Sequence, residues 1–439
     1  MTVGLKHKGF RLWYDLMFYS NGFNSKRFIA RRETFGLLVY DKKRAKIFIA
    51  KGVYSLDGID KLVFADEKGE RTRIEVSEVT LINSNLDLPK DFLFSPTYVE
   101  IYPIMNCNER CFFCYVGNSL THRRMEMSGD IATATANRIG ESGVLTTSIL
   151  GGEPFLYNRL EKLAVNLHDN NTKVSVSTNG TVHNYELFKK LIKIEVGFNV
   201  SFHSHIPEIQ NKIVKNSIGY NKTVATLKFL LNNTSTEYIN VSIVANSLNY
   251  EKIPDTIRFL HEIGIDSVSI YHAQGAGFSV TNNLSRLGYF AWLEMMKEAI
   301  SIGKELGVNV RSVTNYPFFV EKELGFSTDL GLSNFLYGTG DGRRTLYINY
   351  DGCIYPTSYN FPDNRLLLGN VIRDSILDIW QNSVILNYIR NASVPKDCKA
   401  CRFFDICRGG PITNYDLSKY LGHKRIEPNC PIHSKNCIE

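Results

Sequence analysis

Three cysteines near residue 110 are the most informative feature of the 439-residue chain. Cys107, Cys111 and Cys114 form a C-x3-C-x2-C pattern directly after the strand-like run 98–103. Thiolates are soft ligands that select zinc or iron-sulfur clusters, and a closed structural site needs four ligands. A set of three on one short loop therefore indicates a metal centre with one position left for another ligand. A zinc knuckle or three buried thiols are the alternatives.

Residues 149–154 carry a second chemical signal, at the end of the next predicted strand. Gly151 and Gly152 allow the backbone to approach a ligand, because they have no side chain in the way. Glu153 adds a carboxylate that can accept a charge-assisted hydrogen bond from an ammonium group. A lone Gly-Gly-Glu-Pro would be a weak signal, and its place one strand after the cysteine loop makes it strong.

The cysteine spacing, Phe113 before the third cysteine, and the Gly-Gly-Glu-Pro segment together resemble the radical S-adenosylmethionine (SAM) superfamily. The resemblance implies that the three cysteines hold a 4Fe-4S cluster whose open iron is chelated by the amino and carboxylate groups of SAM. An electron from the cluster would cleave SAM to methionine and a 5'-deoxyadenosyl radical. That radical abstracts hydrogen from an unactivated C–H bond.

From about residue 98 to residue 320 the chain alternates short β-branched runs with helical periodicity, which predicts a parallel α/β sheet. The expected strands are 99–103, 144–150, 173–178, 196–202, 238–244, 267–271 and 308–314. The expected helices are 160–169, 185–193, 223–231, 253–263 and 289–306. These units resemble the partial (β/α)6 barrel of the radical SAM fold, in which sites lie at the C-terminal ends of the strands.

Further polar residues follow the ends of predicted strands. Ser177 and Asn179 lie in an S-T-N-G segment that resembles the one beside SAM in this family, although a turn explains Asn-Gly equally well. Ser201 matches a polar strand end that touches SAM in relatives. His203 and His205 are candidates for catalysis, but a lone histidine is more often structural. The SAM contacts implied by the resemblance are Phe113, Gly151, Gly152, Glu153, Ser177, Asn179 and Ser201.

The last third of the chain contains a second group of cysteines. Cys398-x2-Cys401-x5-Cys407, followed by Cys430, has the wrong gaps for a common zinc finger and resembles the SPASM extension of radical SAM peptide maturases. The resemblance implies that these four residues hold an auxiliary 4Fe-4S cluster. A Zn(Cys)4 site at the same residues stays open, because spacing does not separate a tetrahedral zinc from a cluster.

The chain departs from a full SPASM pattern, which binds two auxiliary clusters. The strand and turn expected over 344–352 agree with the family, and a helix is expected at 376–380. Thr357 and Pro411, however, stand where the family has cysteines. The ligands of the first auxiliary cluster are thus missing. The sequence predicts two clusters in total, including the SAM cluster.

Cys353 is the most interesting of the remaining cysteines. It precedes Thr357 by four residues, and in an extended segment this even separation puts both side chains on one face. In relatives that face points toward the substrate. A thiol there could give a hydrogen atom to a substrate carbon radical, as radical SAM peptide epimerases require, or it could be a buried structural cysteine. Cys437 is a bystander or a substitute ligand for Cys430.

Residues 1–95 are expected to form a separate β-rich unit. Apolar runs at 35–40 and 45–50 flank a polar turn, which predicts a β-hairpin. Residues 31–41 resemble the start of precursor-peptide recognition elements, which bind a leader peptide by adding it as a strand to an exposed edge. The alternative is a decoration that caps the barrel. The predicted domains are 1–95, 96–325 and 326–439.

Composition restricts the partners and the compartment. A formal charge of +7 does not argue for nucleic acid, and the basic first fifty residues are more often a solvated face. No apolar run is long enough to span a bilayer, and no secretory signal opens the chain, so we expect a cytoplasmic protein that does not bind membranes. Nine cysteines in such a chain favour metal or redox chemistry over disulfides.

The sequence therefore predicts a radical SAM enzyme that abstracts hydrogen from a ribosomally synthesised precursor peptide. Its reductant would be a flavodoxin or ferredoxin. The outcome would be epimerisation with Cys353 as hydrogen donor, or alternatively cross-linking, backbone rearrangement or dehydrogenation. An oxidase of a small molecule or a protein side chain, and a non-catalytic iron-sulfur or zinc scaffold, are the competing hypotheses.

Overall fold

The structure is a computed structural model, and the fold below refers to the residues it describes. These are residues 28–33, 36–41, 46–50, 61–65, 71–75, 79–82, 89, 92–120, 125–273, 276–281, 287–313, 340–358, 364–391, 395–401 and 430. Cys407, Pro411 and Cys437, which carry predictions above, lie outside these ranges.

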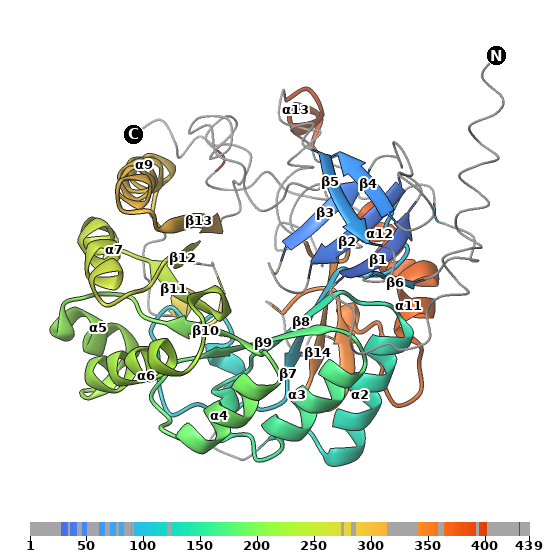
Figure 1. The fold of residues 1–439 in the computed structure, drawn as a ribbon, viewed down its shortest axis with the longest axis horizontal. Helices are drawn as coiled ribbons and strands as arrows, with labels where there is room; N and C mark the ends of the chain where they lie inside the picture. The colour runs from blue at the N-terminus through green and yellow to red at the C-terminus, as the bar shows by residue number, and fades with distance from the viewer. Residues whose placement is uncertain are drawn as a thin grey trace.

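A ten-stranded sheet forms the centre of the molecule, in the order β13-β12-β11-β10-β9-β8-β7-β14-β15-β16. Strands β7 to β13 are mutually parallel, as the alternation of strands and helices predicts (Figure 1). The fold class is therefore confirmed. Their bounds are β7 (Tyr98–Tyr102), β8 (Thr146–Ile149), β9 (Lys173–Thr178), β10 (Gly197–Ser201), β11 (Ile239–Ala245), β12 (Ser267–His272) and β13 (Asn309–Val313).

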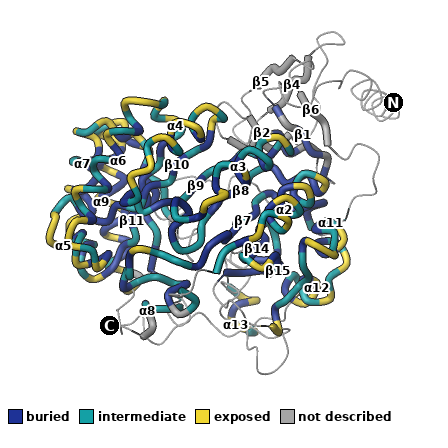
Figure 2. The backbone as a smooth tube through the Cα atoms, turned by 90° about the horizontal axis from the view of Figure 1, so that it is seen from below, coloured by how far each residue is buried: buried dark blue, intermediate teal, exposed yellow. Residues whose placement is uncertain are grey.

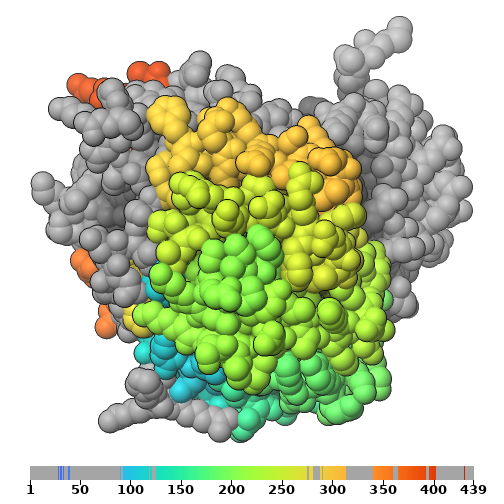
Figure 3. All heavy atoms as spheres, turned by 90° about the vertical axis from the view of Figure 1, so that its left-hand side faces the viewer, coloured from blue at the N-terminus to red at the C-terminus, as the bar shows by residue number. Residues whose placement is uncertain are grey.

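Helices cover one face of this sheet. Alternate apolar residues of the strands, such as Val99, Ile101 and Val176, join one continuous core with the helices, and Figure 2 shows burial along the strands and exposure on the outer helix surfaces. Figure 3 shows part of this helical layer from outside as a continuous surface. The helices are α2 (Gly129–Glu141), α3 (Leu160–Asp169), α4 (Tyr185–Lys193), α5 (Pro207–Val214), α6 (Gly219–Asn233), α7 (Ile253–Glu262), α8 (Phe278–Thr281) and α9 (Tyr289–Leu306).

The C-terminal part continues the same sheet. Strand β14 (Thr345–Asn349) pairs parallel with β7, and β15 (Cys353–Tyr355) and β16 (Gly369–Asn370) follow it in antiparallel pairing. Gly352 makes the predicted turn with a φ of 80°, a left-handed conformation that suits glycine. The expected helix is α11 (Ile376–Asn382), which is followed by α12 (Val384–Arg390) and α13 (Lys396–Lys399).

A separate four-stranded sheet, ordered β3-β2-β1-β6, precedes the central sheet. Strands β2 (Gly36–Asp41) and β3 (Lys46–Ala50) form the predicted antiparallel hairpin. Strand β1 (Phe28–Glu33) pairs with β2 and with β6 (Val79–Ile82), and β4 (Lys61–Ala65) pairs with β5 (Arg71–Glu75). Within the described residues, β3 is an outermost strand of this sheet.

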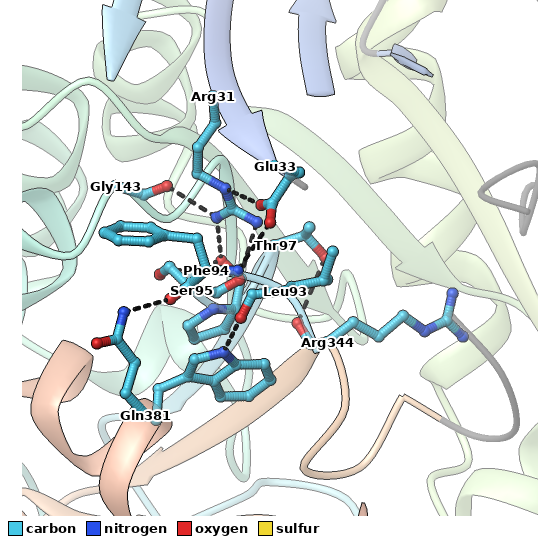
Figure 4. A network of polar contacts seen from close by, with 11 residues as sticks. Arg31, Glu33, Leu93, Phe94, Ser95, Thr97, Gly143, Arg344 and Gln381 are labelled. Atoms are coloured by element: carbon cyan, nitrogen blue, oxygen red, sulfur yellow. Dashed lines mark hydrogen bonds and ion pairs between the residues drawn. The ribbon is translucent and has the colours of Figure 1, made fainter. Parts of the chain in front are cut away.

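A buried arginine attaches this sheet to the rest of the molecule (Figure 4). Arg31 is fully buried and pairs with Glu33, with 2.8 Å between Nε and Oε1. Its Nη atoms donate to the carbonyl oxygens of Ser95, Pro96 and Gly143 at 2.8, 2.8 and 3.1 Å. Desolvation lowers the pKa of Arg31 and raises that of Glu33, and their attraction opposes both shifts. Two buried charges are tolerated here because both are paired and hydrogen-bonded.

The segment 93–97 is where the N-terminal sheet, the central sheet and the C-terminal helices meet. The backbone N–H of Phe94 donates to Glu33 at 2.8 Å, and the indole N–H of Trp380 donates to the Leu93 carbonyl at 2.7 Å. The backbone N–H of Thr97 donates to the Arg344 carbonyl at 2.9 Å. Leu93 also belongs to the main core. The boundary predicted near residue 95 therefore falls inside a buried segment.

Candidate active site

The three cysteines lie on the loop that leaves the C-terminal end of β7. The loop is fastened to the end of α5, because the backbone N–H groups of Arg110 and Phe112 donate to the carbonyls of Val214 and Ile213 at 3.3 and 3.2 Å. All three thiols are half-buried. The loop with the predicted ligands thus lies at one end of the parallel strands, where sites in such folds lie.

The electrostatics of the loop fit a positively charged metal group. Burial raises the pKa of Cys107 to about 12 and that of Cys114 to about 11, and it also raises the pKa of Cys111 well above its ordinary value. Mutual repulsion of the thiolates adds to these shifts. A bound metal group would offset this cost, since metal binding deprotonates cysteine ligands. Among the described residues, no three His, Cys, Asp or Glu side chains are already gathered as a metal site.

The glycines of the Gly-Gly-Glu-Pro segment lie against the backbone of the cysteine loop. The N–H of Gly152 donates to the Ile104 carbonyl, and that of Glu153 donates to the Asn106 carbonyl, both at 2.8 Å. A Cβ on Gly152 would lie 2.0 Å from the Asn106 oxygen, and one on Gly151 would lie 2.3 Å from the Ile104 oxygen. The glycines are therefore required because the two loops are in contact here. From the sequence, only the approach of a ligand explained them.

The carboxylate of Glu153 connects this segment to the S-T-N-G segment. It is 1% exposed, and it accepts hydrogen bonds from the Phe155 N–H at 3.0 Å, the Thr178 hydroxyl at 2.7 Å and the Asn179 N–H at 2.8 Å. Burial raises its pKa to about 7, and these donors oppose the shift. Three of about four acceptor positions on a carboxylate are thus used within the protein. One remains for a ligand.

Asn179 completes the contact with the cysteines. Its Nδ2 lies 3.9 Å from the Cys107 sulfur and 2.9 Å from Asn108 Oδ1, and its Oδ1 accepts from the Thr181 N–H at 2.8 Å. The turn interpretation of Asn-Gly is also correct, because Gly180 has a φ of 70°. The three sequence motifs therefore meet at one place.

Ser177 and Ser201 lie at the ends of neighbouring strands β9 and β10. Their side chains are half-buried, and the Ser177 hydroxyl accepts from Asn199 Nδ2 at 3.2 Å. Ser177 is the first residue of the S-T-N-G segment, and Ser201 lies beside this segment on the neighbouring strand. Contact of either serine with SAM stays a prediction.

The two histidines have structural roles in the described fold. His203 is 1% exposed, and its Nδ1 accepts from the Val244 N–H at 3.2 Å. Burial lowers the pKa of His203 to about 3, so it is neutral at physiological pH. Phe113 contacts its ring edge-on, with 4.8 Å between centroids. His205 is bound through Nδ1 to the Thr256 hydroxyl at 3.0 Å.

Glu109, inside the cysteine loop, is a residue that the sequence argument did not single out. It is 3% exposed, and its Oε2 lies 3.8 Å from the Cys111 sulfur. Its Oε1 accepts from Asn216 Nδ2 at 3.1 Å. The buried carboxylate thus connects the cysteine loop, beside the predicted ligand Cys111, to Asn216. Only its place between two cysteines could have indicated it from the sequence.

Cys353 lies on the same side of the sheet as the cysteine loop. Tyr355 pairs with Tyr347 across β14 and β15, so Cys353, two residues earlier, shares their face. Cys353 and Cys114 both pack against one apolar cluster that includes Tyr102 and Tyr347. Burial raises the pKa of Cys353, so the thiol keeps its hydrogen. Its sulfur accepts from Asn370 Nδ2 at 3.5 Å.

The structure describes three of the four predicted auxiliary ligands. Cys398 is buried at α13, and the N–H of Cys401 donates to the Cys398 carbonyl at 3.2 Å. Cys430 is half-buried. Cys407 lies outside the described residues. The assignment of this set to one cluster stays a prediction.

Known families match both the region that contains the cysteine loop and the C-terminal region. Residues 101–260 match the radical SAM superfamily, and residues 340–402 match SPASM, an iron-sulfur cluster-binding domain. The chain therefore contains a radical SAM domain followed by a SPASM domain, and it is a radical SAM enzyme. The two domains imply SAM, a 4Fe-4S cluster that binds it, and an auxiliary iron-sulfur cluster.

Individual relatives are distant in sequence. The mycofactocin maturase MftC of Mycolicibacterium smegmatis is 24% identical over 74% of this chain and 78% of its own length. The Fe-coproporphyrin III synthase of Methanosarcina barkeri is 22% identical over 69% of this chain and 80% of its own length. The fold is similar to that of SuiB from Streptococcus suis, crystallised with its precursor peptide SuiA, with a TM-score of 0.69, 19% identity, and coverage of 92% and 99% of the two chains.

No helix among the described segments has both the length and the apolar character needed to cross a bilayer.

Proposed function

We propose that the protein is a radical SAM maturase that modifies a ribosomally synthesised precursor peptide. The observation that carries the proposal is the meeting of the cysteine loop, Glu153 and Asn179 at the C-terminal ends of β7, β8 and β9. MftC is a maturase, and SuiB has been crystallised with a precursor peptide. The similarity to SuiB covers 92% of this chain, so it includes part of the region before the central sheet.

In this proposal each motif has a separate task. The three cysteines of the β7 loop hold the cluster, and SAM bound there supplies the radical chemistry. Gly151, Gly152 and Glu153 fix the SAM amino group, and Phe113, Ser177, Asn179 and Ser201 line the remainder of its site. Cys398, Cys401, Cys407 and Cys430 hold the auxiliary 4Fe-4S cluster. A flavodoxin or ferredoxin of the cytoplasm supplies electrons.

The first test is SAM cleavage by the anaerobically reconstituted, reduced protein, which should yield 5'-deoxyadenosine.

Glu153→Gln should weaken SAM binding by about ten- to hundredfold, because a hydrogen bond to a charged group contributes about 1.5–3 kcal/mol. Isothermal titration with SAM measures the change. Glu141→Gln, the same substitution at an exposed position, is the control. Equal SAM affinity in the two variants would show that Glu153 does not bind the ammonium.

The second test concerns recruitment of the peptide at the edge strand β3, where a leader could be added as a strand. Deleting residues 1–95 is unsuitable, because it removes the buried segment that begins at Leu93. Proline at Ile47 or at Phe48 is more selective, since the N–H groups of consecutive strand residues point to opposite edges. In one variant the missing N–H is one that bonds to β2, so this variant is less stable. In the other variant the missing N–H points outward from the sheet, so its stability is unchanged.

We expect the proline variant with unchanged thermal stability to bind a labelled synthetic precursor peptide at least tenfold more weakly in fluorescence anisotropy. Its uncoupled SAM cleavage should equal that of the wild type. Wild-type peptide affinity in both proline variants would mean that β3 is not the recruitment edge, and that the hairpin caps the barrel instead.

A second candidate function is modification of a small molecule. It is favoured by the similarity to the Fe-coproporphyrin III synthase, which is not a peptide maturase by name. The anisotropy experiment separates the two hypotheses, because only a peptide maturase requires the N-terminal sheet to bind a peptide.

A further inference from the structure

Helix α5 and the turn that joins it to α6 form the outer wall of the cysteine loop. Cys111 packs against an apolar cluster that contains Ile213 and Val214 of α5. In the turn, Asn216 Nδ2 donates to Glu109 Oε1 of the loop at 3.1 Å. Exposed side chains of α5 therefore lie about 10–12 Å from the loop, which is the diameter of one helix. This wall is a short route from solvent to a predicted cluster ligand.

The outer surface of this wall is positively charged. Lys212 and Lys215 are exposed, and neither forms an ion pair with any residue that the structure describes. Arg110 adds a half-buried guanidinium in the cysteine loop, where it donates to two backbone carbonyls at 2.5 and 2.8 Å. Glu208, at the start of α5, is an exposed charge of opposite sign. Three cations thus face one exposed carboxylate.

Two residues of the turn contradict the local preferences of their positions. Lys215 ends α5 with a φ of 53°, a left-handed conformation in which glycine or asparagine is usual. Ile218 is the N-cap of α6, where serine, threonine, aspartate or asparagine is preferred, and it is 50% exposed. One exposed apolar residue is ordinary by itself. A strained cation and an ill-placed apolar residue in one turn, however, indicate a surface kept for function.

We propose that Arg110, Lys212, Lys215 and Ile218, here called the α5–α6 surface, bind an acidic one-electron carrier protein. The inference deepens the proposed function and rests on it, because it requires a cluster in the cysteine loop. Charge complementarity selects an acidic partner, and Ile218 provides an apolar contact. Electron-transfer interfaces are small and weak, so a surface of this size is sufficient.

The short route to the cysteine loop favours an electron carrier over other acidic partners. A flavodoxin hydroquinone anion would give up one electron and become the neutral semiquinone. The oxidised 4Fe-4S cluster would gain that electron. No proton is transferred and no covalent bond forms or breaks, so the carrier needs contact with the outside of the wall and no entry into the site.

The first experiment measures the binding of a flavodoxin of net negative charge to the reconstituted enzyme by biolayer interferometry. The test variant combines Lys212→Glu with Lys215→Glu. At low ionic strength it should bind about tenfold more weakly than the wild type, because two attractions become two repulsions. The loss should shrink as added salt screens the charges.

The matched control combines Lys193→Glu with Lys228→Glu, which changes the net charge equally at exposed positions. Lys193 is the last residue of α4, and Lys228 lies in the second half of α6. Both helices begin on the side of the sheet where the cysteine loop lies, so these lysines are far from it. The control should bind flavodoxin as the wild type does.

SAM cleavage supplies a second readout. With limiting, pre-reduced flavodoxin, the test variant should form 5'-deoxyadenosine about tenfold more slowly than the control, in proportion to its weaker association. With dithionite, the two variants and the wild type should be equal, because a small inorganic reductant does not need the α5–α6 surface.

Two single variants keep the proposal testable if the charge reversal disturbs the fold. Lys215→Asn and Ile218→Ser place residues that suit the left-handed position and the N-cap. Both should therefore be at least as thermally stable as the wild type. Each should nevertheless bind flavodoxin about two- to threefold more weakly, because each loses one contact at the edge of a weak interface.

The outcomes separate this surface from the proposed function. Equal flavodoxin affinity in the test variant and the control, whether both are wild-type-like or both are weakened, overturns the α5–α6 surface and leaves the proposed function standing. Wild-type affinity in both single variants also overturns it. A wild type that cleaves no SAM with either reductant overturns the proposed function, and with it the reason for an electron carrier to dock here.

Discussion

Replacing Cys107, Cys111 and Cys114 together by alanine is expected to halve the iron content of the reconstituted protein and to abolish SAM cleavage. Two sets of four-iron cluster ligands predict about eight irons per chain, and the variant should retain about four. The loss of cleavage should be complete because the loop then has no thiolate to hold the cluster that binds SAM. Iron and acid-labile sulfide assays, with mass-spectrometric metal analysis, measure the change.

The complementary variant replaces Cys398 and Cys401 by alanine. It should also retain about four irons, and it should still cleave SAM, because the β7 loop is untouched. Zinc without iron in the triple variant would contradict the auxiliary cluster and favour the Zn(Cys)4 alternative. Cleavage by the triple variant would contradict the assignment of the cysteine loop.

The strands and most helices could be predicted because their signals are local. Helix α4 was predicted with its observed bounds, since its apolar residues recur at helical spacing and Asn184 caps its first turn. Helix α2, from Gly129 to Glu141, was not predicted, because alanine, threonine and glycine leave it little apolar periodicity. The side chain of Ser128, which accepts from the Ile131 N–H, was the signal that could have identified it.

Strands β7 to β13 lie in the sheet in chain order, whereas the pairing of β14 with β7 and other contacts across long separations did not follow from the sequence. The carbonyls bound by Arg31 lie between 64 and 112 residues away, and no spacing rule identifies such partners. The same holds for Gly152. A side chain at this position would collide with the Asn106 carbonyl, and no spacing in the sequence reveals that contact. The motifs therefore predicted residues that the fold brings together at the ends of β7, β8 and β9, and the fold shows why two of them are glycines.

The central sheet is polar on the face opposite its helices, and the sequence contains a signal for this face. Residues such as Glu100, Asn199 and Asn240 alternate with valine and isoleucine within strands that had been identified by their β-branched content. Period-two alternation in a parallel sheet is itself a sign of a functional face, because such sheets are normally apolar on both sides.

Cys353→Ala is expected to retain SAM cleavage and hydrogen abstraction while losing product formation, if the enzyme inverts a peptide α-carbon. The carbon radical must then be quenched from the opposite face, and Cys353 packs against the same apolar cluster as Cys114. Its raised pKa keeps the S–H bond available at neutral pH. The reaction would be redox neutral overall, which is compatible with the absence of a cysteine at Thr357.

The measurement is turnover of the precursor peptide in deuterium oxide, followed by mass spectrometry and chiral analysis of the product. Wild-type product should carry one solvent deuteron at each inverted carbon, and Cys353→Ala should yield none. Cys353→Ser is the matched variant, because it keeps a side chain of similar size without the thiol. A wild-type product that is two hydrogens lighter and contains no deuterium would instead indicate cross-linking or dehydrogenation. It would also remove Cys353 from the reaction, because a two-electron oxidation of the peptide needs an electron acceptor and not a hydrogen donor.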